Sequence, residues 1–293
     1  MKTTNVSITR TIAVALTMSA ILLGQSTMGQ NQWVGGVAPA PPAPIPGSPW
    51  DWSTGGNWIG GVPTALQTVQ VSPLVPNAVA QVGTPGAVAG MLQIGNGGTV
   101  AVYLGGTLTV NILDIAVAAG TPGTFALNAG ALTVDQLWVG PLGTYTDTGL
   151  GTLTLTGPGF IGVIPATTIN SPISGTSGLI SAGPGILTFA GNNSYSGGTI
   201  ISNGVLQVGN GGTSGTLGSG AIINLSSLVF NRSNAITVGD PISGTGSLTM
   251  TGGGVLTLNG PTPTAAAPRL TRSAGTAGSW RATTRHSARA IST

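Results

Sequence analysis

Residues 172–191 read PISGTSGLISAGPGILTFAG, and residues 241–260 read PISGTGSLTMTGGGVLTLNG. The two stretches align without a gap at an offset of 241 − 172 = 69 in the numbering, and 11 of the 20 aligned positions are identical. Both consist of short runs in which apolar residues alternate with polar ones, separated by glycine-rich turns. Alternation with a period of two indicates β-strands, and recurrence at a regular spacing indicates a solenoid. We interpret the offset as three coils of equal length, since 69 = 3 × 23.

The same pattern extends toward the N-terminus. Three similar triplets, Leu108-Thr109-Val110, Leu132-Thr133-Val134 and Leu153-Thr154-Leu155, are separated by 24 and 21 residues. One such coil cannot bury its apolar face alone, but coils stacked about 4.8 Å apart close a continuous core and satisfy one another's backbone groups. The sequence therefore predicts an all-β fold, a right-handed parallel β-helix of about ten coils over residues 50–260.

The composition agrees with this fold. The chain of 293 residues contains 50 glycines and only 4% charged residues, against a usual charged fraction of about 25%. Glycine and asparagine supply the positive backbone angles that tight corners need. Like charges on successive coils would repel along the whole stack, so a low charge content favours stacking.

Residues 185–209 read GILTFAGNNSYSGGTIISNGVLQVG. This stretch resembles the autotransporter-associated β-strand repeat, and residues 215–222, GTLGSGAI, resemble the segment that usually follows that repeat. The resemblance implies an exported passenger-type β-helix of a bacterium, of the kind found in large surface or extracellular proteins. It implies no catalytic residues, because the family motif is structural.

The N-terminus has the order of an export signal. Lys2 and Arg10 provide positive charge, Ile12–Leu23 is an apolar run, and small residues follow. The run is too short to span a bilayer. We predict a signal peptide at residues 1–29, a proline-rich spacer at residues 30–49, and a mature chain without a transmembrane segment, at the outer membrane surface or extracellular.

The net charge of +3 and the pI of about 10.0 suggest an acidic partner until the charges are located. Seven of the eight cationic residues lie near the chain ends, and residues 50–260 keep only Arg232. The same range holds five aspartates, for a net charge of 1 − 5 = −4: Asp51, Asp114, Asp135, Asp147 and Asp240. A basic groove for nucleic acid is therefore not expected. Without cysteine the chain has no disulfide and no thiolate metal site, and we predict no cofactor and no metal.

Candidate catalytic groups are few. A nucleophilic triad needs a base, and the single histidine, His286, lies in the C-terminal tail. The chain has no glutamate, so a carboxylate pair reduces to Asp114 and Asp135, which are 21 residues apart and could stack on adjacent coils as in polysaccharide-cleaving β-helices. Such a site also needs cationic groups, and Arg232 is isolated. We predict no catalytic residues and solvated aspartates, with a polysaccharide-cleaving enzyme as the alternative.

Aromatic residues offer a second alternative, a glycan-binding surface protein. Trp50, Trp52 and Trp58 lie within nine residues of one another. They could form a platform for carbohydrate stacking, but capping the open end of the sheet against water is the favoured interpretation. Tyr195 is expected to pack on a neighbouring coil.

The composition changes abruptly after Gly260. Residues 261–293 contain five arginines and the histidine, and strand alternation ends. Codons shifted by one reading frame permit Ala-Asn-Thr-Tyr-Ser-Gly-Gly-Thr-Thr-Ile, a copy of the repeat where the offset between the two stretches would place it. We therefore hypothesise a frameshifted, disordered basic tail and a solenoid that ends near Gly260.

Together these features predict an exported, non-catalytic structural protein that serves in display, spacing or adhesion. Its partner is unknown from the sequence. Surface glycans or other cell-surface material are the candidate classes.

Overall fold

A computed structural model describes residues 31–33, 52–53, 58–59, 62–71, 79–116, 122–260, 269–272 and 279–282. Every regular element in these ranges is a β-strand, as the alternation predicts. No helix in the described ranges is long and apolar enough to cross a membrane. The predicted signal peptide, residues 1–29, lies outside them.

The strands form four sheets, named A to D here. Sheet A, in spatial order, contains β2 (Trp58–Ile59), β1 (Asn31–Trp33), β3 (Thr68–Val71), β5 (Ala87–Ile94), β7 (Thr107–Ile115), β9 (Ala131–Val139), β11 (Thr152–Val163), β14 (Leu179–Ala182), β16 (Thr199–Ile201), β18 (Ile222–Asn224) and β21 (Ile242–Ser243), with β13 (Ile173–Ser174) also paired to β11. Sheet B contains β10 (Gly143–Asp147), β8 (Gly123–Asn128), β6 (Gly98–Tyr103) and β4 (Val79–Val82). Sheet C contains β12 (Thr167–Ile169), β15 (Ile186–Phe189), β17 (Val205–Val208), β19 (Ser227–Asn231), β22 (Ser247–Thr251) and β24 (Arg269–Arg272). Sheet D contains β20 (Ile236–Val238), β23 (Val255–Leu258) and β25 (Ser279–Ala282).

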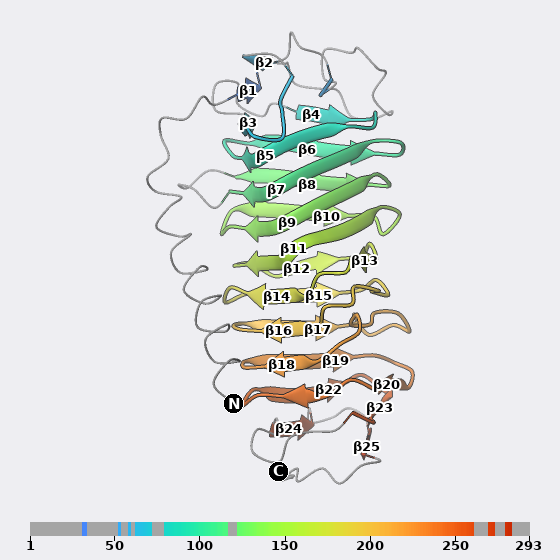
Figure 1. The fold of residues 1–293 in the computed structure, drawn as a ribbon. Coiled ribbons are helices and arrows are strands. Elements are labelled where there is room, and N and C mark those ends of the chain that lie inside the picture. Colours follow the sequence, from blue (N-terminus) through green and yellow to red (C-terminus); the bar gives the residue numbers. More distant parts are fainter. Residues whose placement is uncertain are drawn as a thin grey trace. The chain divides into compact units, whose positions relative to one another are not determined.

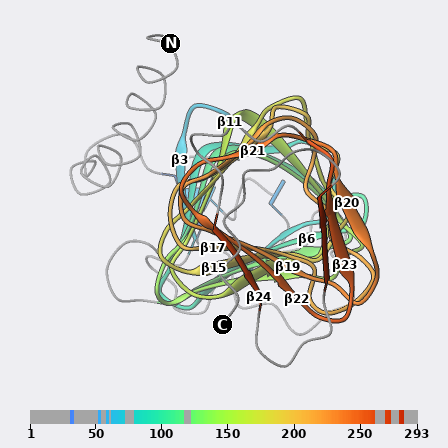
Figure 2. The ribbon, with the colours of Figure 1, turned by 90° about the horizontal axis from the view of Figure 1, so that it is seen from below.

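The sheets are the faces of a parallel β-solenoid. Sheet A holds nine successive parallel strands from β3 to β21, so the solenoid has about nine turns (Figure 1). Apart from the antiparallel pair β1–β2, every ladder between named strands is parallel. Viewed along its axis, the strands surround a single interior (Figure 2). The predicted parallel β-helix is confirmed.

The core follows from the alternation. Along sheet A, Leu92, Leu113, Leu137 and Ile161 are in register on successive coils and fully buried. Burying one such aliphatic side chain stabilises the fold by about 1.5–3 kcal/mol, and a residue on the next coil covers each one. The stack of apolar side chains therefore holds the coils together.

Glycine allows close approach between coils at the corners. Gly175 and Gly244 have positive φ angles of 125° and 105°. A Cβ atom at either position would collide with a backbone carbonyl of the preceding coil, that of Leu155 or Asn224 respectively. Asn96 adopts a positive φ of 50° at another corner. These corners confirm the role predicted for glycine and asparagine.

The interpretation of the offset of 69 as three whole coils is wrong. In sheet A, Ile180 stacks in register on Ile200, then Ile223, then Ser243, so three coils advance the numbering by only 243 − 180 = 63. Leu179 lies in sheet A, whereas its counterpart in the second copy of the repeat, Leu248, lies in sheet C. Equivalent positions of the two copies therefore lie on different faces of the solenoid, and the second copy is displaced by one face along the path of the chain. This is possible because every face has the same alternation of buried apolar and outward polar side chains.

A seam divides the solenoid at its middle. Sheet B ends with β10, and sheet C begins with β12 on the following coil. On the same coils, the pairing of β11 with β9 skips from Leu155 to Phe160, which leaves an irregular segment in β11. Across the seam, the Asp147 carboxylate accepts hydrogen bonds from the backbone N–H groups of Asn170 (2.9 Å) and Ser171 (2.7 Å) and from the Ser171 hydroxyl (2.6 Å). One side chain thus connects the two coils where the sheets change.

Both ends differ from the predicted boundaries. β1 lies in the segment for which a spacer was predicted, and it pairs with β3. At the other end β24 pairs with β22, and β25 pairs with β23. The solenoid therefore continues beyond Gly260, where its end was expected, because the tail contains two short segments that extend existing ladders. The rest of residues 261–293 lies outside the described ranges, and the frameshift stays a hypothesis.

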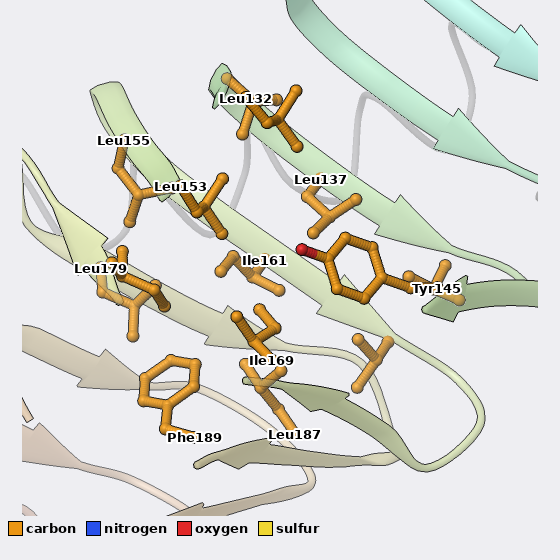
Figure 3. Close-up of a cluster of buried hydrophobic side chains, with 14 of the residues drawn as sticks. Leu132, Leu137, Tyr145, Leu153, Leu155, Ile161, Ile169, Leu179, Leu187 and Phe189 are labelled. Atoms are coloured by element: carbon orange, nitrogen blue, oxygen red, sulfur yellow. The ribbon is translucent and has the colours of Figure 1, made fainter. Parts of the chain in front are cut away.

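Tyr145 provides a test of the core. Its hydroxyl is buried and points toward Ile161 among leucine side chains (Figure 3). Burial, and after it the nearby Asp147 carboxylate, raises the pKa of Tyr145, but no hydrogen bond of normal geometry joins the hydroxyl to a described residue. Its ring stacks on Phe125 at 5.8 Å, a contact that phenylalanine would keep. An unpartnered buried hydroxyl costs free energy, so we expect Tyr145→Phe to raise the free energy of unfolding by about 1 kcal/mol. Urea denaturation measures this; a loss of similar size would show that the hydroxyl has a stabilising partner.

Candidate functional site

The two aspartates considered for catalysis do not form a pair. Val110 is in register with Val134, and Ile112 with Gln136, so Asp135 falls between these two register pairs. Asp114 is in register with Trp138 instead. It is only 2% exposed, so the prediction of a solvated aspartate is wrong at this position. The sequence separation of the two aspartates, 135 − 114 = 21, differs from the length of this coil, which is 136 − 112 = 24 residues. The two aspartates therefore do not stack.

Asp135 lies beneath the irregular segment of β11. A Cβ atom added to Gly157 would lie 2.7 Å from its carboxyl carbon, and one carboxylate oxygen is buried without a hydrogen-bond partner among the described residues. Burial raises the pKa of Asp135, and a hydrogen bond from the Gly159 backbone acts in the opposite direction. Within the described ranges, no group of three or more acidic or histidine side chains is placed to hold a metal ion.

Arg232 has a structural environment. It is 5% exposed, and its guanidinium donates to the carbonyls of Gly215 and Thr213 and to Oδ1 of Asn234, the last at 2.9 and 3.1 Å. Desolvation by burial lowers its pKa. These contacts hold the loop that follows β17 against the next coil. Its hydrogen-bonding capacity is used within the fold.

Of the N-terminal tryptophans, Trp52 and the backbone of Trp58 lie in the described ranges. Trp52 is 2% exposed and belongs to the hydrophobic core, and its backbone N–H donates to the Gln81 carbonyl at 2.8 Å. It therefore packs against the first coils rather than offering a face to a sugar. Trp50 and the side chain of Trp58 lie outside the described residues.

Tyr195 packs on the next coil, as predicted. Its side chain is fully buried, and its hydroxyl is 2.8 Å from the Thr199 hydroxyl. Gly218 on the following coil lies so close that an added Cβ would be 2.5 Å from the Tyr195 ring. Burial raises the pKa of Tyr195 to about 12. The residue is thus a neutral part of the core at physiological pH.

Sheet A carries an ordered row of amide, carboxylate and indole side chains on the side of its strands opposite the buried leucines. Gln70, Gln93, Asp114 and Trp138 occupy successive coils in register. The Gln70 amide donates to Gln93 Oε1 at 3.1 Å, and the Gln93 amide donates to Asp114 Oδ2 at 3.4 Å. The buried carboxylate of Asp114 thereby fixes the direction of the whole ladder.

An aromatic pair follows this row. The rings of Trp138 and Phe160 are 4.4 Å apart with a tilt of 33°. A Cβ atom added to Gly162, the register partner of Trp138 on the next coil, would lie 2.7 and 2.8 Å from the six-membered ring of the indole. The indole therefore lies over the backbone of Gly162, and its Nε1 donates to Gln136 Oε1 at 3.4 Å.

We call Gln70, Gln93, Gln136, Trp138 and Phe160 the aromatic–amide strip. The sequence does not single out this strip, because Trp138 is isolated in the chain and its partners come from other coils. The signal available was the alternation of β9, which places Gln136 and Trp138 on the side of the strand opposite the buried Leu137. Gln93 and Trp138 lie in register with Asp114, one on the coil before it and one on the coil after it. This register depends on the lengths of the coils, which the sequence leaves ambiguous.

Comparison with known proteins agrees with this solenoid architecture. Residues 179–208, which span β14 to β17, match the family described as passenger-associated-transport-repeat. The chain is also 36% identical over 156 residues to the adhesin BmaC autotransporter of Brucella suis biovar 1 (strain 1330). That match covers 49% of this chain but only 4% of the adhesin. No solved structure matches the chain.

The described residues thus define a parallel β-solenoid. The repeat match, at the residues where the sequence resembled the family, makes the assignment more specific. The chain thus carries an autotransporter-associated repeat at residues 179–208.

Proposed function

We propose that the chain is an exported structural segment at a bacterial surface, where it displays or spaces adhesive elements without catalysis. The observation that carries this proposal is the passenger-associated-transport-repeat match over residues 179–208. In an autotransporter, the passenger is the part that is exported. The similarity to an adhesin supports a role at the cell surface or in the extracellular space.

The geometry supports a non-catalytic role. The carboxylates that could have served a polysaccharide-cleaving enzyme are separated: Asp114 is buried at the end of an amide ladder, and Asp135 lies beneath Gly157. Arg232, the cation that could have assisted them, is engaged by backbone carbonyls on other coils. A long, regular stack of coils is suited to holding an adhesive element at a distance from the membrane.

Export is tested directly in the native bacterium. We expect about the first 29 residues to be removed, because positive charge, an apolar run and small residues occur in the order of a signal peptide. Mass spectrometry of extracellular and surface-shaved material measures the mature N-terminus. Recovery of peptides that span intact Met1 to Gln30 outside the cell would contradict this cleavage. Retention of the whole chain inside the cell would contradict the proposed function.

A further inference from the structure

The aromatic–amide strip combines an aromatic side chain of partial exposure, Trp138, with half-buried amide side chains, Gln70 and Gln93, which is a composition suited to a ligand site. We propose that it binds a neutral glycan, with one pyranose ring stacked on Trp138 and with glycan hydroxyls hydrogen-bonded to Gln93 and Gln70. This inference rests on the proposed surface function only in placing the protein where glycans are met.

The aromatic step follows from the position of the indole. Its six-membered ring lies over Gly162, where the missing side chain lets it rest against the neighbouring strand. The ring of Phe160 and the hydrogen bond to Gln136 further restrict its orientation. Trp138 nevertheless keeps partial exposure. An aromatic face held rigidly beside polar groups is suited to the flat apolar C–H face of a pyranose, and the preorganisation limits the entropy lost on binding.

The hydrogen-bonding step follows from the ladder. Gln70 and Gln93 are half-buried, and each uses one amide hydrogen to reach the next coil. Among the described residues no acceptor takes the second amide hydrogen of Gln70 or Gln93, so it can donate to a ligand hydroxyl. From Gln70 to Trp138 the row covers three strand spacings, about 14 Å at ~4.8 Å each. The row therefore repeats along the solenoid axis, as the hydroxyls of an extended oligosaccharide repeat along its chain.

The charge of the strip selects the class of glycan. The row contains one carboxylate, Asp114, which is 2% exposed and committed to Gln93. None of the residues of the strip is cationic. Acidic glycans bind where arginine or lysine pairs with their carboxylates, and this strip would repel them weakly instead. A neutral hexose oligosaccharide is therefore the favoured ligand.

The test uses the purified full-length chain on an array of neutral hexose oligosaccharides, with polygalacturonate and sialylated oligosaccharides as acidic comparisons. We expect binding to at least one neutral linear oligosaccharide and not to the acidic ones. Dissociation constants for the neutral hit are then measured by titration calorimetry. Trp138→Ala should weaken binding by at least about tenfold, and Trp138→Phe, which keeps an aromatic face, by no more than about threefold.

Two further variants separate binding from folding. Gly162→Ala keeps the tryptophan but places a methyl group against its ring, so it should also weaken binding by about tenfold. Ile223→Thr is the control. Ile223 lies in the same sheet, four coils from Trp138, and its replacement should leave affinity unchanged. Circular dichroism confirms that each variant is folded.

The proposal is overturned if the wild-type chain binds no neutral oligosaccharide at millimolar concentration, if it prefers the acidic ones, or if Trp138→Ala binds as the wild type does. These results are independent of export. A chain found at the surface that binds no glycan would remove this inference and leave the proposed function standing.

Discussion

Replacing Asp147 with alanine is expected to lower the free energy of unfolding by about 4 kcal/mol, because hydrogen bonds to a charged group are worth about 1.5–3 kcal/mol each and buried donors left unpaired add to the loss. The carboxylate accepts from the backbone N–H of Gly149, Asn170 and Ser171 and from the Ser171 hydroxyl, at 2.6 to 2.9 Å. Ser171 is fully buried, so water cannot replace the lost acceptor there. Urea denaturation followed by far-ultraviolet circular dichroism measures the change.

Asp240 provides the matched control for this prediction. Its carboxylate also bridges two coils, but it accepts one described hydrogen bond, from Gly220 N–H at 3.0 Å. Asp240→Ala should therefore cost about 1 kcal/mol. Asp147→Asn, which keeps one oxygen acceptor, should fall between the two alanine variants. Equal losses for Asp147→Ala and Asp240→Ala would show that the seam is held by something other than this carboxylate.

The buried core could be predicted from the sequence. The alternation around Leu108, Leu132 and Leu153 placed these residues on successive coils, and the structure puts them in register and buries all three. Period-two alternation identifies which side of a strand faces the core because only the inward side is shielded from water. Fold class and core therefore follow from local pattern alone.

Register between distant coils does not follow from that pattern. Leu179 and Leu248 occupy equivalent positions in the repeat but lie in sheets A and C. Every sheet requires the same alternation of buried apolar and outward polar residues, so this alternation does not show to which sheet a strand belongs. The advance per coil along sheet A varies from 200 − 180 = 20 (Ile180 to Ile200) to 136 − 112 = 24 (Ile112 to Gln136). Any site built across coils, such as the aromatic–amide strip, therefore needed the three-dimensional register.

The irregular segment of β11 shows the same limit at a single residue. Between the register pairs Leu155–Val134 and Phe160–Gln136, four residues of β11 (156–159) pass opposite one residue of β9, Asp135. Asp135 faces this segment and is separated from the column of Asp114. A bulge depends on the positive φ angles of Gly157 and Gly159, 53° and 58°, and the chain has too many glycines for the sequence to single these out.

Close stacking of coils predicts a second large effect, at Gly218. An alanine Cβ there would lie 2.5 and 2.6 Å from ring atoms of Tyr195 and closer still to the Tyr195 carbonyl oxygen. That carbonyl accepts the Ser219 backbone N–H at 2.8 Å, so it cannot move without breaking a bond between coils. Overpacking of this kind typically costs about 1–3 kcal/mol, and the backbone contact places Gly218→Ala at the upper end, about 3 kcal/mol.

Gly253 isolates this effect from the general cost of replacing glycine. An added Cβ at Gly253 meets no atom within 4 Å, so Gly253→Ala should change the free energy of unfolding by less than about 0.5 kcal/mol. Both variants add one methyl group to a turn of the same solenoid, and they differ in whether a neighbouring coil occupies the space. Thermal and urea denaturation of the two proteins, compared with the wild type, measure the difference. If Gly218→Ala unfolds within about 0.5 kcal/mol of Gly253→Ala, the coils have room between them, and close packing of Gly218 on Tyr195 does not limit the stability of this solenoid.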